Sequence, residues 1–261
     1  MLKKVSMQDM TVILTILNKE WARPGSVLDI FLESFRLGEG TSHLLNHLLI
    51  FTVDGQGFRY CRSVHLHCFN LENYRFNFSA WNTFQGQQSH KLGWRKIELL
   101  AEIIKLGYSV VFTDADVTWL RNPLPHILSS VEIATACELH AEDGQGQEGK
   151  RADGGFFFMK SNDRSVEFLN YWRVVRVVYP NFSPQSAFEM IRAEGMADQI
   201  GMRIKYLPTN HFGSFCNWGK DLSQVVIAHA KCYQGITKKV EHLRHMLNVW
   251  ENHKAASSTQ K

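Results

Sequence analysis

Two aspartates separated by one residue, Asp114 and Asp116, directly follow an apolar run, YSVVFT, at residues 108–113. Such a run is typical of a buried strand, and ligands of doubly wound sheets bind at the carboxyl ends of strands. If the chain stays extended here, its period of two directs both carboxylates to the same side. Two carboxylates can hold a divalent cation, which binds the diphosphate of a nucleotide sugar and neutralises the departing nucleoside diphosphate.

Two alternatives compete with this metal site, because a D-x-D triplet often arises by chance. One is an acidic turn at a strand end that caps a helix. The other is the phosphatase motif of the haloacid dehalogenase type, with Asp114 as nucleophile and Asp116 as general acid. That motif normally opens its domain and needs a second acidic cluster downstream, whereas Asp198 and Asp221 are isolated. The metal site is therefore favoured.

Strand and helix patterns alternate around these residues. Apolar runs predict strands at 11–17, 47–53, 64–69 and 108–113. Helical spacing of apolar residues predicts helices at 27–37 and 91–106. Later come an apolar run at 131–137, a Gly-rich loop at 138–149 that we expect to be mobile, a strand at 154–159 and a helix at 166–178. The alternation predicts an α/β fold with a doubly wound, mostly parallel sheet flanked by helices.

Length and composition limit the class of protein. A chain of 261 residues suits one large α/β domain, and a net charge of +4 without a basic stripe excludes a nucleic-acid footprint. No apolar run approaches the roughly 20 residues that span a bilayer, and no signal peptide is recognisable. The chain is therefore cytosolic, or its targeting segment is missing from it. Five scattered cysteines without a C-x-x-C pair argue against a zinc site and imply no full disulfide framework.

Three blocks extend the pattern around the aspartates. They are a core block from Arg95-Lys96 through Asp114-Ala115-Asp116 to Arg121-Asn122-Pro123, then Asp153-Gly154-Gly155-Phe156 with Lys160-Ser161-Asn162, and finally His229-Ala230-Lys231-Cys232. In order and spacing, from about residue 6 to 250, they resemble the plant nucleotide-diphospho-sugar transferases of glycosyltransferase family 77. The resemblance makes residues 1–261 a single transferase domain with its core at 6–250.

The resemblance implies a GT-A, Rossmann-like fold and a retaining transfer from a UDP-sugar that uses Mn²⁺ or Mg²⁺. It implies that the sugar is a pentose, since xylosyl and arabinosyl transfers are the family's known activities. The acceptor would be a wall polysaccharide or a hydroxyproline-rich glycoprotein. It also implies residence in the Golgi lumen through an N-terminal membrane anchor, which this chain lacks.

The family's motifs also assign roles to individual residues. Asp114 and Asp116 match its metal-binding pair, and His229 matches the distant histidine that completes the metal site in related enzymes. Mn²⁺ accepts such a mixture of nitrogen and oxygen ligands. A lone histidine is otherwise more often structural, so this role of His229 depends on the resemblance.

Further residues are expected to bind the nucleotide sugar. Arg95 or Lys96 would reach the diphosphate from a helix, although each is equally well a solvated helix charge. Asn18, just after the first strand, would lie near the base and ribose, although it is equally well a turn residue. The remaining donor-binding candidates are Ala115, Asp153, Gly154 and Gly155; the glycines permit close backbone approach and the Asp153 carboxylate would bind sugar hydroxyls.

One stretch departs from the family. Where the family has an acidic residue on each side of a glutamine, this chain has Ser183-Pro184-Gln185-Ser186. Gln185 is retained, and in related retaining enzymes this region lies beside the anomeric carbon. Loss of both acids predicts weak transferase activity. Asp153 is the one nearby motif acid that could take their place. The loss also leaves open a second interpretation, a catalytically silent member that binds nucleotide sugar and assists a partner transferase.

Overall fold

The computed structural model describes residues 2–73, 88–127, 131–139, 150–214 and 221–258. The chain forms two compact units. Unit 1 comprises Met1–Val12, Tyr74–Val111 and Leu128–Tyr206; unit 2 comprises Ile13–Asn73, Phe112–Ile127 and Leu207–Lys261. In the described part of the chain, no helix is both long and apolar enough to cross a membrane.

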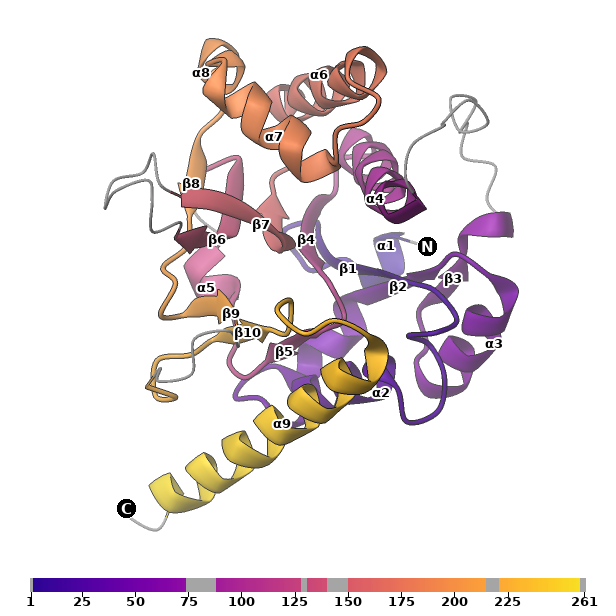
Figure 1. Cartoon of the computed structure of the whole chain (residues 1–261), viewed down its shortest axis with the longest axis vertical. Coiled ribbons are helices and arrows are strands. Elements are labelled where there is room, and N and C mark those ends of the chain that lie inside the picture. Colours follow the sequence, from indigo (N-terminus) through magenta and orange to yellow (C-terminus); the bar gives the residue numbers. More distant parts are fainter. Residues whose placement is uncertain (1, 74–87, 128–130, 140–149, 215–220, 259–261) are drawn as a thin grey trace. The chain divides into compact units, whose positions relative to one another are not determined.

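Unit 2 contains a parallel group of strands, a small mixed sheet and a long C-terminal helix (Figure 1). In chain order its elements are β1 (Thr11–Leu17, whose first two residues belong to unit 1), α2 (Val27–Leu37), η1 (Ser42–His47), β2 (Leu48–Thr52), α3 (Gly55–Val64), β3 (Cys68–Asn70), η2 (Leu71–Asn73), β5 (Val117–Trp119), α5 (Leu124–Ile127), β9 (Phe212–Ser214), β10 (Ile227–His229) and α9 (Ile236–Ser258). Helix α9 packs on α2.

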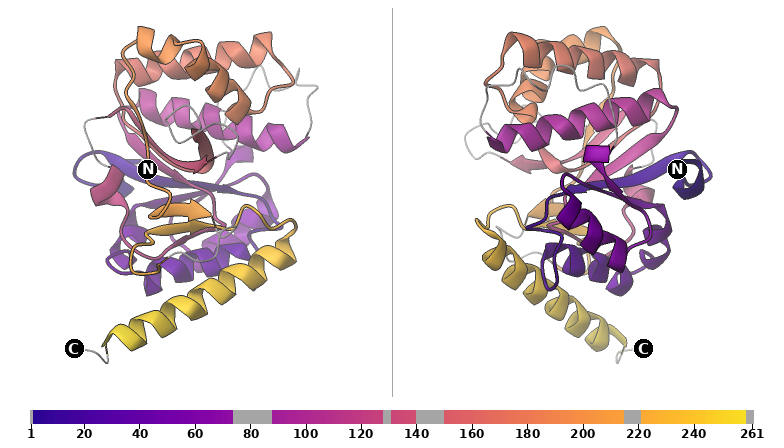
Figure 2. Two further views of the ribbon diagram at one scale, coloured as in Figure 1. Left: turned by 60° about the vertical axis from the view of Figure 1, so that its left-hand side comes forward. Right: turned by 90° about the vertical axis from the view of Figure 1, so that its right-hand side faces the viewer.

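Unit 1 contains the remaining strands and a layer of packed helices. Its elements are α1 (Leu2–Val5), α4 (Gln88–Lys105), β4 (Ser109–Thr113, whose last two residues belong to unit 2), β6 (Ile133–Leu139), β7 (Lys150–Met159), α6 (Asp163–Val178), α7 (Pro184–Ala193), α8 (Met196–Gln199) and β8 (Ile204–Tyr206). Helices α4, α6 and α7 contact one another, and Figure 2 shows α4 and α6 side by side.

In unit 2, β2 pairs with both β1 and β3, and β10 pairs with both β5 and β9; in unit 1, β6 pairs with both β7 and β8. Strands β1, β2 and β3 pair in parallel, whereas β7 runs antiparallel to β6. All residues of β1 and β2 are buried, as expected for parallel strands that are covered on both faces. The predicted α/β class is confirmed.

Most predicted elements are present within a few residues of the expected bounds. Helix α4 buries the predicted apolar face, including Ile97, Leu100 and Ile104, and Gly107 follows it with a φ of 88°. The expected strand at 64–69 is wrong, because residues up to Val64 form α3, which Asp54 caps by accepting a hydrogen bond from Gly57 N. The strand begins at Cys68. Of the expected loop at 138–149, the first two residues end β6 and the others lie outside the described residues.

Unit 2 contains a disulfide bond that the spacing of the cysteines did not predict. Cys61 on α3 is bonded to Cys68 at the start of β3. Cys232 is also disulfide-bonded, whereas the buried Cys137 of unit 1 is a free thiol. The Cys61–Cys68 bond closes a short loop and fixes the end of α3 against the edge strand.

Candidate metal and nucleotide-sugar site

Asp114 and Asp116 belong to unit 2 and lie on a turn between β4 and β5. Strand β4 ends at Thr113 and β5 begins at Val117, whose N–H donates to Asp114 O at 3.3 Å. The expected extended backbone is therefore wrong here: the turn, not strand alternation, directs the two carboxylates. The helix-capping alternative is also wrong, since a strand follows the turn. Asp116 is 3% exposed, and Asp114 is half-buried.

A buried tryptophan braces this turn. Trp119 Nε1 donates to Thr113 Oγ1 at 3.2 Å, which ties the two sides of the turn together. Its backbone N–H donates to Ser34 Oγ of α2 at 3.1 Å, and its ring stacks on Phe35 with 4.4 Å between centroids. Because Trp119 is fully buried, these contacts fix the backbone from which both aspartates project.

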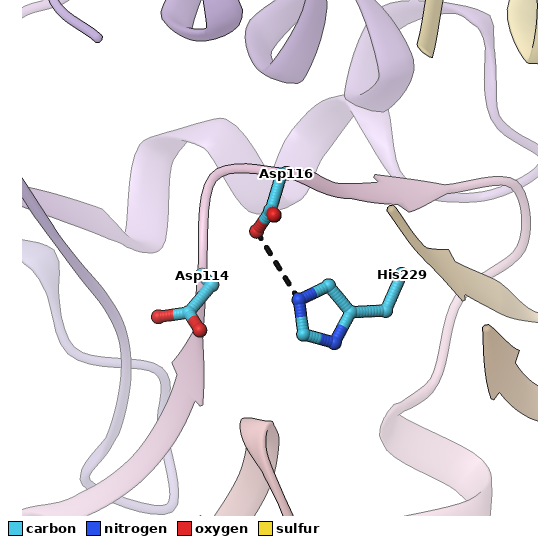
Figure 3. A group of neighbouring side chains, drawn as sticks. All are labelled: Asp114, Asp116 and His229. Carbon is cyan, nitrogen blue, oxygen red and sulfur yellow. Dashed lines mark ion pairs between the residues drawn. The ribbon is translucent and has the colours of Figure 1, made fainter. Parts of the chain in front are cut away.

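Strand pairing brings His229 to the aspartates. Strand β10 runs antiparallel to β5 and places His229 opposite Val117. The bond from Ala230 N to Asp116 O, 2.9 Å long, continues this pairing past the strand ends. One ligand atom from each of Asp114, Asp116 and His229 lies within 4.8 Å of the other two. Figure 3 shows Asp114, Asp116 and His229 gathered around one space, with the imidazole turned toward Asp116.

The charges around Asp116 keep it ionised. His229 Nε2 lies 3.2 Å from Asp116 Oδ1, and Lys239 Nζ donates to Asp116 Oδ2 at 2.5 Å. Burial by itself raises the pKa of Asp116, but the charges and hydrogen bonds of His229 and Lys239 outweigh it and hold the pKa below its usual value. The carboxylate is therefore available as a metal ligand at neutral pH.

Lys239 is the site residue that the sequence did not point to. It lies in the first turn of α9, a helix for which no prediction was made. A signal existed: the first turn has two lysines and no acidic residue, although the helix dipole disfavours cations at that end. The contact with Asp116 depends on tertiary structure, which places the start of α9 beside the β4–β5 turn.

The triad suits a divalent cation by its chemistry. Two carboxylates and one imidazole offer the mixed oxygen and nitrogen ligands that Mn²⁺ accepts, and they leave further positions for ligands from a substrate. A cation held there would supply the positive charge that neutralises a departing diphosphate.

A second set of predicted residues lies together on β7 in unit 1. Thr135 of β6 pairs with Phe157, and Cys137 pairs with Ala152, so residues 153–156 of β7 lie opposite a single residue of β6. This β-bulge contains Asp153, Gly154 and Gly155. Bulges of this kind redirect side chains and are frequent beside active sites. Asp153 is 7% exposed and accepts a hydrogen bond from Gly155 N at 2.9 Å.

Side chains bond the backbone of β7 beside and within this bulge. Gln185 Nε2 donates to Ala152 O at 2.5 Å, and Glu189 Oε1 accepts from Ala152 N at 2.7 Å. Lys96 Nζ donates to Gly154 O at 2.7 Å. Lys96 is therefore brought to the predicted glycine stretch and Gln185 to the residue before Asp153, and Glu189 is a positioning residue that the sequence did not indicate.

The departure at Ser183–Ser186 is the start of helix α7. Ser183 is the N-cap, its Oγ accepts from Ser186 N at 3.0 Å, and Pro184 occupies the first turn. Ser is favoured at the N-cap and Pro in the first turn, so Pro184, which replaces one of the family's acids, stabilises a helix end. Trp172 Nε1 donates to Pro184 O at 2.9 Å.

For three other predicted residues, the structure shows their place in the fold. Asn18 Oδ1 accepts from Trp21 N at 3.2 Å, in the turn that follows β1. Ala115 is buried between the two aspartates. Arg95 lies on α4 next to the fully buried Trp94. Their part in nucleotide binding stays a prediction.

Comparison with known proteins assigns the class. Galactosyltransferase LgtC, solved in complex with donor and acceptor sugar analogs, superposes with a TM-score of 0.54 at 10% identity, over 92% of this chain and 96% of that one. The fold is that of the GT-A glycosyltransferases.

Sequence comparison then gives the family. Residues 43–243 match the nucleotide-diphospho-sugar transferase family, and the chain belongs to it. An uncharacterised protein of Arabidopsis thaliana is 34% identical over 259 residues, which cover 99% of this chain and 68% of that protein. A beta-arabinofuranosyltransferase of the same plant is 32% identical over 111 residues, 41% of this chain and 20% of that protein. The resemblance to this family is confirmed, and the phosphatase alternative is wrong.

Proposed function

We propose that this glycosyltransferase is metal-dependent and takes its sugar from a UDP-sugar, with Mn²⁺ or Mg²⁺ held by Asp114, Asp116 and His229. The convergence of these three side chains, which come from two distant segments of unit 2, carries the proposal. The two aspartates come from the β4–β5 turn, and His229 comes from the end of β10. These segments are distant in the sequence, so the fold must bring the three side chains together.

The other predicted residues retain their proposed roles in donor binding. Asp153 and Gln185 are the proposed catalytic residues. The proposed nucleotide-sugar ligands are Asn18, Arg95, Lys96, Asp114, Ala115, Gly154 and Gly155. The hydrogen bonds of Lys96 and Gln185 to the β7 backbone support the proposal that these side chains hold the glycine stretch in one conformation.

We further propose a retaining transfer of a pentose to a cell-wall polysaccharide or glycoprotein. The similarity to a beta-arabinofuranosyltransferase over part of the chain supports a pentose. We propose the Golgi lumen as the compartment, with 6–250 as the core of one catalytic domain. The Cys61–Cys68 disulfide supports this compartment, because disulfides persist in oxidising environments such as the secretory lumen.

The metal proposal is tested by thermal unfolding with UDP in the presence and absence of Mn²⁺. A ligand at about 100 times its Kd adds roughly 2.7 kcal/mol to the free energy of unfolding. UDP should therefore raise the Tm much more with Mn²⁺ than without it. Asp116→Asn should abolish the Mn²⁺-dependent part, whereas Asp198→Asn, an exposed aspartate on α8, should retain it. An equal UDP effect with and without Mn²⁺ contradicts the metal assignment.

The second candidate function is a silent family member that binds nucleotide sugar and assists a partner transferase. The observation in its favour is that the two positions expected to be acidic, Pro184 and Ser186, are uncharged residues in the first turn of α7, which Ser183 caps. Slow hydrolysis of a UDP-sugar distinguishes the two functions, because an active transferase leaks its donor to water. We expect weak hydrolysis. A chain that binds UDP with Mn²⁺ and hydrolyses no UDP-sugar is the silent member.

A further inference from the structure

Lys239 adds a fixed positive charge to the triad of unit 2. Its ammonium group donates to Asp116 Oδ2 at 2.5 Å and to Ala230 O at 2.9 Å, and it lies 5.7 Å from the centre of the Trp21 ring. The side chain is 14% exposed. Two acceptors and a nearby aromatic ring hold the ammonium group, so its position is defined by the fold.

The place of Lys239 in its helix indicates that this contact has a purpose beyond helix stability. Its N–H donates to Gly235 O in the first turn of α9, where the helix dipole is positive. A lysine there is unfavourable for the helix, and its long side chain loses rotamer freedom when it is held. The pairing with the buried Asp116 carboxylate offsets these costs.

Asp116 divides its two oxygens between its neighbours. Oδ1 lies 3.2 Å from His229 Nε2, and Oδ2 accepts from Lys239. The Oδ1 atom is thus on the side of the other triad members, while Oδ2 is taken by the ammonium group. Of the two carboxylate charges that attract a cation to the triad, Lys239 offsets one.

We propose that Lys239 makes binding of the divalent cation conditional on the nucleotide diphosphate, an inference that rests on the proposed metal site. An ammonium group beside a ligand carboxylate repels a bare cation, because like charges at short range in a buried site interact strongly. A cation that arrives with a diphosphate brings compensating negative charge. The coupling is reciprocal, so the cation also strengthens UDP binding by the same factor.

The test compares Mn²⁺ affinity of two lysine variants by isothermal titration calorimetry, first without nucleotide and then with saturating UDP. Lys239→Met removes the ammonium group and keeps a long, unbranched side chain. Lys238→Met is the matched control, because the exposed Lys238 lies in the same helical turn and the net charge changes equally. Lys239→Gln keeps a hydrogen-bond donor without the charge, and it replaces the methionine variant if circular dichroism shows that variant misfolded.

Without nucleotide, Lys239→Met should bind Mn²⁺ about tenfold more tightly or better than the unmodified chain, because a nearby like charge is removed. Lys238→Met should stay within about twofold, since an exposed charge is screened. The ratio of Mn²⁺ Kd values without and with UDP should shrink only for the Lys239 variants. Unchanged or weaker Mn²⁺ binding by both Lys239 variants overturns the inference.

Asp116→Asn separates a failure of this inference from a failure of the proposed function. If that variant binds Mn²⁺ in the presence of UDP as the unmodified chain does, the metal site itself is wrong. If it loses Mn²⁺ and the Lys239 variants behave as the unmodified chain does, the metal site stands and the role of Lys239 is refuted.

Discussion

Replacing Glu189 by alanine should loosen β7 at Ala152, the residue directly before the bulge. In the structure, Glu189 Oε1 accepts from Ala152 N at 2.7 Å, and Ala152 is 6% exposed. The truncated side chain leaves that amide without this acceptor in a buried strand. An unsatisfied buried amide costs about 1–3 kcal/mol. Since 1.4 kcal/mol is a factor of ten, hydrogen exchange at the Ala152 amide should become about 5- to 150-fold faster.

Two further variants separate the contributions of Glu189. Its Oε2 atom accepts from Arg192 Nε at 3.0 Å, so the alanine variant also loses an ion pair. Arg192→Met removes that pair, together with a guanidinium group 6.0 Å from the Tyr206 ring, and keeps the bond from Ala152 to Glu189; the pair is partly exposed and worth about 0–1 kcal/mol. Glu189→Gln keeps a neutral acceptor for Ala152 and should recover most of the protection. The expected order of exchange rates is therefore alanine fastest, then glutamine, then Arg192→Met.

The assay is residue-resolved amide exchange, with UDP-sugar hydrolysis measured in parallel. If Asp153 acts in catalysis as proposed, Glu189→Ala should lower kcat for hydrolysis and leave Mn²⁺-dependent UDP binding intact, because the bulge carries Asp153 and the metal triad belongs to unit 2. Unchanged exchange at Ala152 in the alanine variant would refute the positioning role of Glu189. Faster exchange with an unchanged kcat would confirm that Glu189 positions Ala152, and it would show that Asp153 takes no part in the chemistry.

Three more predictions test the fold and the altered stretch. Burial lowers the pKa of His65, whose Nε2 bonds Leu48 O, so stability that is present above about pH 6.5 should fall as the pH falls below it; urea unfolding should show less loss for His65→Gln, which does not titrate. Arg121→Lys should cost about 1.5–3 kcal/mol in urea unfolding, because the guanidinium group bonds two carbonyls and lies 4.6 Å from a tryptophan ring; a cost below about 0.5 kcal/mol, as at any exposed surface site, would contradict this. Pro184→Asp with Ser186→Asp should raise UDP-sugar hydrolysis without tightening UDP binding, and an unchanged rate would show that the chemistry does not depend on this stretch.

Several elements could be predicted because their patterns are local. The run TVILTIL is buried at every position in β1, and the apolar stripe of α4 faces the core as its spacing indicates. The error at 64–69 is also local in origin. The cap at Asp54 sets the start of α3, and that helix continues through residues whose apolar character suggested a strand.

The position of Asp114 and Asp116 after a strand was also predictable, since they follow an apolar run, whereas His229 was identified only because it matches a family block. Their convergence was not predictable from the chain alone, because it depends on the antiparallel pairing of β10 with β5. The same holds for the Cys61–Cys68 bond, which forms because α3 returns the chain to the edge of the sheet.

The sequence by itself determined the α/β class, the family and the candidate ligands, because short-range patterns of burial and residue type carry that information. Only the structure decided that a turn directs the two aspartates, that Lys239 shares Asp116 with His229, and that Gln185 and Glu189 bond the carbonyl and the N–H of Ala152. The bonds of Lys239, Gln185 and Glu189 join residues that are far apart in the chain. Such contacts form only when packed helices and paired strands bring the residues within hydrogen-bond distance.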